Sequence, residues 1–228
     1  MEFPGLADRL RQVRTAIQER QRIAGLTHPV SIVAVTKGHG PEAVRAALAA
    51  GLGIVGENRV QEARDKQEAT AGLSVHWHLI GTLQKNKARH AAARFELIHS
   101  VDRLDLAVEL DRRTDPEAIQ RILVQVNCSA EPQKGGVEPK ALPGLLDEIA
   151  RLRRLNVAGL MTMAALTGDI GEQRRAFALL RTLRDAAAAR GHAGTELSMG
   201  MSGDYLVAVE EGATMVRLGT LLFGERNP

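Results

Sequence analysis

Short apolar runs alternate with longer amphipathic segments along nearly the whole chain. Eight runs rich in branched and small apolar residues predict strands, at residues 31–36, 53–56, 75–81, 95–100, 122–127, 157–161, 196–199 and 215–219. Alanine- and leucine-rich segments between them predict helices, such as the one that Pro41 opens and Gly51 closes. Eight strand–helix repeats without a linker predict a single (β/α)8 barrel of the α/β class. A doubly wound open sheet remains an alternative, because the second and seventh runs are weak.

The first 25 residues have a helical period instead. Leu6, Leu10, Val13 and Ile17 recur at helical spacing, which predicts an amphipathic helix that packs on something larger. We therefore expect residues 1–228 to form one domain, in which residues 1–25 provide a helix against the barrel.

Composition and charge narrow the class of protein. The 228 residues are 44% hydrophobic and 25% charged, which is typical of a soluble globular domain with a substantial core. The net charge is only +3, basic and acidic residues are interspersed, and aromatic residues make up 3%. A nucleic-acid surface built on base stacking is therefore not expected.

The lack of a signal peptide or membrane span in the sequence, together with a single cysteine, predicts a cytoplasmic protein. No apolar run approaches the roughly 20 residues of a membrane span, and the amino terminus lacks the layout of a signal peptide, so no membrane partner is expected. The single cysteine, Cys128, excludes an internal disulfide and agrees with a reducing compartment. It is interpreted as a partly buried spectator rather than a reactive thiol. No metal site is expected.

The functional site of such a barrel lies at the carboxyl ends of its strands. Lys37 ends the first predicted strand in "SIVAVTKGHGP", Asn58 follows the second, His78 lies in the third, and Met161 ends the sixth. The segment after Lys37 could simply be polar turn material. Alternatively, partial desolvation at the mouth of a site lowers the pKa of the lysine amine and makes it a Schiff-base nucleophile.

Two glycine-bearing turns carry a more specific signal. "SMGMSGDY" contains Ser202, and "LGTLLFG" contains Gly219 and Thr220, each just before a predicted helix. Backbone N–H groups at helix starts bind anions, and barrels commonly hold phosphate after strands seven and eight. A phosphate site beside Lys37 suggests a ligand with both a phosphate and an aldehyde, and pyridoxal 5′-phosphate (PLP) fits.

The chain resembles the pyridoxal phosphate homeostasis proteins through six motifs in order, from about Val33 to Gly224. They are "AVTK", "GENRVQE", "WHLIGTLQKNK", "GLMTM", "LSMGMSGDY" and "MVRLGTLLFG". The resemblance implies a fold-type III barrel, similar to the amino-terminal barrel of alanine racemase, that holds PLP as a Schiff base. It further implies a role for each matching residue: Lys37 as the Schiff-base lysine, Ser202, Gly219 and Thr220 at the phosphate, Arg217 facing the pyridine nitrogen, Asn58 near the cofactor, and His78 and Met161 lining the pocket.

The sequence departs from the family pattern in three places. "GHGP" follows Lys37, "KGG" at 134–136 replaces the more usual Lys-Ser-Gly, and no basic tail follows Pro228. These departures leave cofactor binding intact but put in doubt a secondary PLP site that depends on that tail.

The resemblance also predicts function. An arginine cannot accept a proton, so the pyridine nitrogen facing it stays unprotonated and PLP is a weaker electron sink. The racemases add a second domain with a catalytic tyrosine, whereas here Tyr205 falls in the "MSGDY" turn. We therefore expect a monomeric carrier or buffer of PLP, without catalytic residues, that serves vitamin B6 and amino-acid homeostasis and supplies apo-PLP enzymes. A single-domain amino-acid racemase, a Schiff-base aldolase and a pure scaffold remain alternatives.

Overall fold

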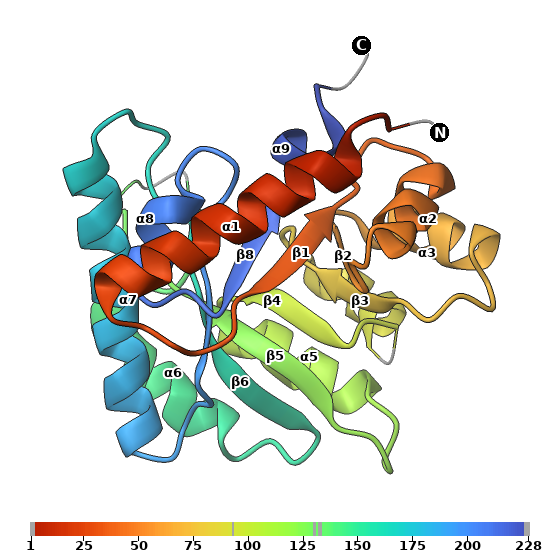
Figure 1. The fold of residues 1–228 in the computed structure, drawn as a ribbon. Coiled ribbons are helices and arrows are strands. Elements are labelled where there is room, and N and C mark those ends of the chain that lie inside the picture. The colour runs from red at the N-terminus through yellow and green to blue at the C-terminus, as the bar shows by residue number, and fades with distance from the viewer. Residues whose placement is uncertain (1–2, 93, 130, 132–133, 226–228) are drawn as a thin grey trace.

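The fold is a closed barrel of parallel strands. The computed structural model describes residues 3–92, 94–129, 131 and 134–225. Within these ranges eight strands pair in chain order, as Figure 1 shows. They are β1 (Ser31–Val35), β2 (Ile54–Glu57), β3 (His76–Leu79), β4 (Leu97–Val101), β5 (Gln120–Gln125), β6 (Leu155–Met161), β7 (Glu196–Ser198) and β8 (Met215–Leu218). The (β/α)8 prediction is confirmed.

Closure depends on the pairing of the first strand with the last. β1 lies parallel to β8, with Ser31 opposite Met215 and Val33 opposite Arg217. This pairing excludes the open-sheet alternative. Both weak runs of the sequence are strands, although β7 has only 3 residues. The pairing also places the loops after β1 and β8 side by side.

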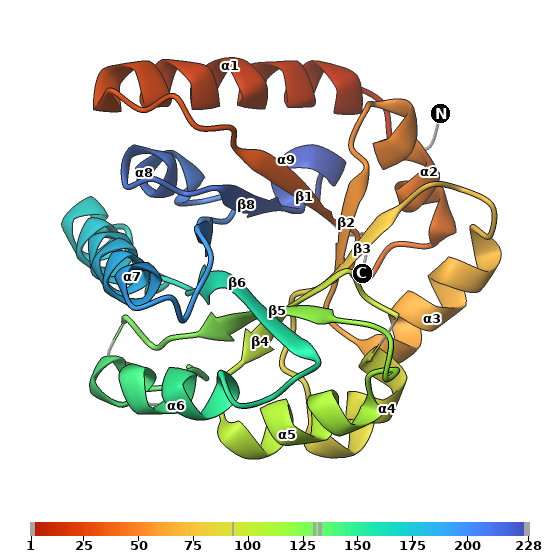
Figure 2. The ribbon, with the colours of Figure 1, turned by 90° about the horizontal axis from the view of Figure 1, so that it is seen from below.

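Helices surround the barrel, as the view along its axis shows (Figure 2). In the described part of the chain they are α1 (Leu6–Ala24), α2 (Pro41–Ala49), α3 (Val60–Ala69), η1 (Lys85–Lys87), α4 (Ala88–Ala91), α5 (Leu104–Arg113), η2 (Pro139–Ala141), α6 (Leu142–Ile149), α7 (Ile170–Ala189), α8 (Tyr205–Glu210) and α9 (Thr220–Phe223). The predicted stop at Gly51 is present as a left-handed residue with φ 82°.

The amino-terminal helix α1 lies on the outside of the barrel against α8 and α9. Its buried residues are the four that the helical period predicts: Leu6, Leu10, Val13 and Ile17. The helix ends at Gly25, whose φ of 67° is easily reached only without a side chain.

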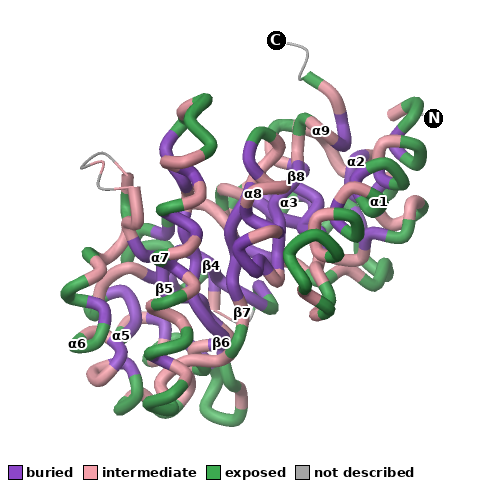
Figure 3. The backbone as a smooth tube through the Cα atoms, turned by 60° about the vertical axis from the view of Figure 1, so that its left-hand side comes forward, coloured by how far each residue is buried: buried purple, intermediate pink, exposed green. Residues whose placement is uncertain are grey.

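The core has two layers, an outer one between strands and helices and an inner one inside the barrel. Successive residues of a strand point to opposite faces, so Val33 belongs to the inner cluster and its neighbour Ala34 to the outer one. The inner cluster contains Val33, Leu97, Leu123, Ala158, Met161 and Met215. Figure 3 shows the buried strands inside a more exposed ring of helices.

Among the described residues, no helix is both long and apolar enough to cross a membrane.

Candidate functional site

A cavity of about 560 Å³ opens at the carboxyl ends of the strands. Loops after β1, β2, β3, β6, β7 and β8 contribute to its lining. Six of the eight expected site residues line it: Lys37, Asn58, Ser202, Arg217, Gly219 and Thr220. The structure therefore brings together, from four different loops or strand ends, residues that are up to 183 positions apart, from 37 to 220.

The two other expected residues do not line this cavity. His78 is 2% exposed and contacts another histidine, and Met161 is 1% exposed within the inner apolar cluster. Both are buried inside the barrel.

Lys37 lies half-buried in the short loop between β1 and α2. The loop turns at once, because Gly38 has φ 75° and the His39 N–H donates to the Thr36 carbonyl oxygen at 3.0 Å. The Thr36 N–H extends the pairing with β2 by donating to the Gly56 carbonyl oxygen at 3.2 Å. These bonds hold Lys37 at the rim of the cavity.

The turns after β7 and β8 form the wall next to β1. The Ser202 hydroxyl accepts a hydrogen bond of 3.3 Å from the Leu221 N–H, which joins the β7 loop to the first turn of α9. A Cβ atom at Gly219 would lie 3.3 Å from the Val35 carbonyl oxygen, so the β8 loop passes close to β1. This wall consists mainly of backbone and small side chains, which lets a ligand approach main-chain N–H groups.

Below the cavity a polar layer crosses the barrel. Arg217 donates to the Ser198 hydroxyl at 2.6 Å, Ser198 lies 2.9 Å from His99 Nδ1, and His99 Nε2 lies 3.0 Å from His78 Nδ1. We call these four residues the imidazole chain. Burial lowers the pKa of His78 to about 4 and that of His99 well below its usual range. Both rings are therefore neutral at physiological pH.

Arg217 is the cation of this layer and is 4% exposed. Burial lowers its pKa to about 10, with the charge of Asp204 acting in the opposite direction, so it stays protonated near neutral pH. It also donates to the Thr162 carbonyl oxygen at 3.0 Å. Among the described residues, no carboxylate lies within ion-pair distance of its guanidinium, which contributes to the cavity lining. This cation is thus available to a polar atom of a ligand.

A second buried cluster was not predicted from the sequence: Lys66 and Glu57 form an ion pair beneath the Lys37 loop. One signal was present: Glu62 and Lys66 are four residues apart, the spacing of an ion pair on one face of a helix. The contact with Glu57 carries no such signal, because Glu57 belongs to the preceding strand.

Two other residues considered in the sequence lie apart from the cavity lining. Tyr205 begins α8, and burial raises the pKa of its phenol. Cys128 is half-buried, and burial raises the pKa of its thiol to about 11, as expected for an unreactive cysteine. Across the described ranges, no three His, Cys, Asp or Glu side chains are grouped so that they could hold a metal ion.

Comparison with known proteins gives matches over nearly the whole chain. Residues 9–227 match the family described as "Alanine racemase, N-terminal domain". A pyridoxal phosphate homeostasis protein from Aquifex aeolicus is 41% identical over 222 residues, which cover 96% of this chain and 97% of the relative. One from Pseudomonas aeruginosa is 41% identical over 226 residues, covering 97% and 96%.

Solved structures give the same relationship. PipY of Synechococcus elongatus PCC7942 without PLP has 40% identity and a TM-score of 0.85, with 96% of this chain and 100% of PipY covered. PipY with PLP bound has 39% identity and a TM-score of 0.84 at the same coverage. An alanine racemase from Corynebacterium glutamicum, at 20% identity and a TM-score of 0.75 over 97% of this chain and 61% of its own, shares the fold. By these full-length relatives, the chain belongs to the family of pyridoxal phosphate homeostasis proteins.

Proposed function

We propose that the chain binds PLP in the cavity described above and acts as a carrier or buffer in PLP and amino-acid homeostasis. The observation that carries this proposal is the combination, in one cavity, of the Lys37 side chain, the buried Arg217 cation and the glycine turns after β7 and β8. The PLP-bound structure of PipY, 39% identical to this chain, supports the choice of ligand.

The residues present fit the chemical groups of PLP. When bound, PLP supplies an aldehyde that condenses with a primary amine, and Lys37 would provide that amine. Ser202, Gly219 and Thr220 would hold the phosphate through the hydroxyl and backbone N–H groups. Arg217 would donate to the pyridine nitrogen, since a guanidinium is a donor only, and Asn58 would contact the ring from the β2 side.

The same cavity lining supports carriage rather than turnover. An arginine donor keeps the pyridine nitrogen unprotonated, which weakens any carbanion chemistry. Tyr205 does not line the cavity, so it is not in place as an acid or base. We propose that the protein acts in the cytoplasm as a one-domain monomer, residues 1–228, and delivers PLP to apo-enzymes. His78 and Met161 are assigned to the support of the site.

An absorbance spectrum before and after borohydride reduction tests PLP binding. The purified protein mixed with PLP should gain a visible band, and peptide mapping after reduction should place the pyridoxyl group on Lys37. Lys37→Ala should lose the band completely. A pyridoxyl group confined to Lys87 or Lys134 would refute the assignment.

A transfer assay tests the carrier role. The PLP-loaded protein should reactivate an apo-PLP enzyme, while racemase, transaminase and decarboxylase turnover on common amino acids stays negligible. Steady turnover of about 1 per second or more, the low end of ordinary enzymes, would replace the carrier by an enzyme.

A further inference from the structure

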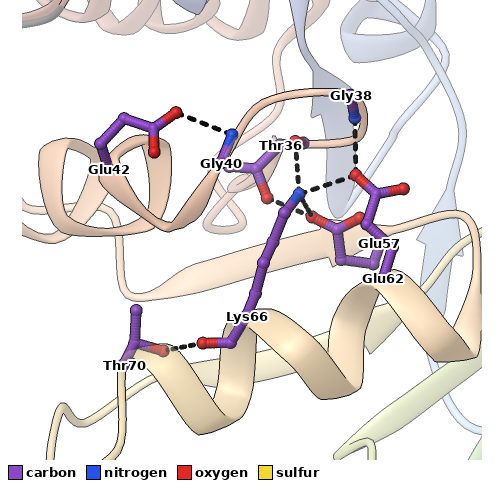
Figure 4. A network of polar contacts seen from close by, with 8 residues as sticks. All are labelled: Thr36, Gly38, Gly40, Glu42, Glu57, Glu62, Lys66 and Thr70. Atoms are coloured by element: carbon purple, nitrogen blue, oxygen red, sulfur yellow. Dashed lines mark hydrogen bonds and ion pairs between the residues drawn. The ribbon is translucent and has the colours of Figure 1, made fainter.

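Five residues from the β1–α2 loop, β2 and α3 form a largely buried network next to Lys37, and Figure 4 shows how they are connected. We call it the ion-pair network: Thr36, Gly38, Glu57, Glu62 and Lys66. The Lys66 side chain is 5% exposed, that of Glu57 0% and that of Glu62 28%. Two carboxylates and one ammonium therefore meet directly behind the loop that carries the site lysine.

Lys66 uses all three of its N–H donors within this network. Its Nζ donates to the Glu57 carboxylate at 2.6 Å, to the Thr36 carbonyl oxygen at 2.7 Å and to the Glu62 carboxylate at 2.9 Å. An ammonium has three donors and no acceptor, so its orientation is fully determined. Hydrogen bonds to charged groups are also the stronger class.

The network holds the backbone on both sides of Lys37. On one side, Thr36 accepts from Lys66 through its carbonyl oxygen, and its hydroxyl donates to Glu57 Oε1 at 2.5 Å. On the other side, the Gly38 N–H donates to Glu62 Oε1 at 2.6 Å. The residues before and after Lys37 are thus both connected to α3, while Lys37 itself lines the cavity.

Burying the charges of the ion-pair network costs desolvation free energy. Burial raises the pKa of Glu57, against the hydrogen bonds from Lys66 and Thr36, and Glu57 Oε2 is buried without a hydrogen-bond partner among the described residues. Apolar side chains in place of a buried ion pair often give equal or greater stability. A function in placing the loop accounts for the charges better than stability alone.

We propose that Lys66, together with Glu57 and Glu62, is a positioning residue that fixes the loop around Lys37 so that its amine meets the ligand aldehyde. The inference rests on the proposed function, because it requires Lys37 to be the amine that reacts. In that reaction Nζ of Lys37 adds to the aldehyde carbon, a C=N bond forms and water is released. The residues of the ion-pair network do not take part in this bond. They reduce the number of loop conformations, so that the Lys37 amine is held where the bond can form.

The test compares four forms of the apo-protein: wild type, Lys66→Met, Glu57→Gln/Lys66→Met, and Arg64→Met as a control. Arg64 lies on the same helix, but its ion pairs with Asp65 and Glu68 are exposed. The double variant removes both buried charges, so it leaves no unpaired Glu57 carboxylate and should fold. Three quantities are measured: the rate of PLP capture by Lys37, the affinity for pyridoxine 5′-phosphate, and hydrogen exchange of residues 36–40.

We expect the double variant to capture PLP about tenfold to hundredfold more slowly than wild type, the range that a small misplacement of a reacting group produces. Its residues 36–40 should exchange faster. Its affinity for pyridoxine 5′-phosphate, which has an alcohol in place of the aldehyde, should stay within about twofold, because the hydrogen bonds of the ion-pair network do not involve the turns after β7 and β8 that are assigned to the phosphate. Arg64→Met should match wild type in all three.

A second variant keeps the proposal testable if Lys66 cannot be replaced. Glu62→Ala removes a partly exposed side chain and leaves the Lys66–Glu57 pair intact, yet it removes the acceptor of the Gly38 N–H. It should also exchange faster at 36–40 and capture PLP more slowly. Wild-type capture and exchange in both the double variant and Glu62→Ala would overturn the positioning role, and so would an equal loss of pyridoxine 5′-phosphate affinity. Failure of wild type itself to form the visible band would instead overturn the proposed function.

Discussion

The ion-pair network connects the β1–α2 loop with β2 and α3, whereas the imidazole chain crosses the inside of the barrel; each contains a buried cation, but the two are built differently. In the ion-pair network the Lys66 cation contacts two carboxylates directly. In the imidazole chain the Arg217 cation contacts a hydroxyl and a carbonyl oxygen, and the two histidines beyond Ser198 are neutral. Lys66 is thus paired with acidic side chains, whereas Arg217 forms part of the cavity lining.

The difference shows how a barrel can use buried charge in two ways. A buried cation that contacts its counter-ions stabilises the folded chain, because removing either partner leaves an unpaired buried charge. A buried cation without a carboxylate partner is hydrogen-bonded only to neutral groups, and it can still form a strong, charge-assisted hydrogen bond with a ligand. Four changes, in decreasing order of their predicted effect on stability, test this contrast.

Lys66→Met should have the largest effect on the apo-protein. It leaves the fully buried Glu57 carboxylate with only the Thr36 hydroxyl, so the free energy of unfolding should fall by about 3–5 kcal/mol. Denaturant titration measures the change. The Glu57→Gln/Lys66→Met variant should recover most of it. A decrease of less than about 1 kcal/mol would mean that the Lys66–Glu57 pair does not stabilise the fold.

Lowering the pH should decrease the free energy of unfolding through the imidazole chain. The His78 pKa is about 4 in the folded protein against an ordinary 6.5, so the unfolded chain binds the proton first. This contribution to stability is complete above pH 6.5 and is lost as the pH falls towards 4, by about 3 kcal/mol at ~1.4 kcal/mol per unit. His99 acts in the same direction.

Unfolding free energies of wild type and His78→Gln between pH 7.5 and 4 measure this effect. The variant should lose less stability across the range, whereas His90→Gln, at an exposed histidine whose pKa is lowered by less, should change the slope less than His78→Gln. Identical slopes in His78→Gln and wild type would show that His78 titrates normally.

Arg217→Met should separate folding from ligand binding. It removes donors from Ser198 and the Thr162 carbonyl oxygen, which should cost about 1–3 kcal/mol of apo-protein stability, less than Lys66→Met. PLP affinity should fall more than about tenfold, since the cation is assigned to the ligand. Equilibrium dialysis against PLP measures the second quantity. The contrast fails if the two variants lower apo stability equally.

Ser202→Ala should have the smallest effect, and one confined to the ligand. Ser202 is half-buried and, among the described residues, its side chain makes one hydrogen bond, which it accepts from the Leu221 N–H, so apo stability should hardly change. PLP binding should weaken by roughly 1–2 kcal/mol, the scale of one hydrogen bond to a charged group. A dissociation constant equal to that of wild type would place the phosphate elsewhere.

Much of the fold and part of the site could be predicted before the structure. The eight strands and the buried face of α1 follow from local period, which needs no knowledge of partners. Lys37 and the turns with Ser202 and Gly219 follow from their place after strands, because a barrel gathers strand ends at one face. The placement of His78 and Met161 at the cavity could not be judged this way, since a strand end faces either the opening or the layer beneath it.

Local sequence patterns thus specify which elements form and which residues stand at their ends. Barrel closure, which places Val33 opposite Arg217, and the contacts between buried polar groups are set by the assembled fold. Ser198 and His99 are 99 residues apart, and Thr36 and Lys66 are 30 apart on different elements. Local patterns report the face of an element that is buried, whereas a contact between two buried polar side chains depends on strand register and barrel closure, which only the assembled chain fixes.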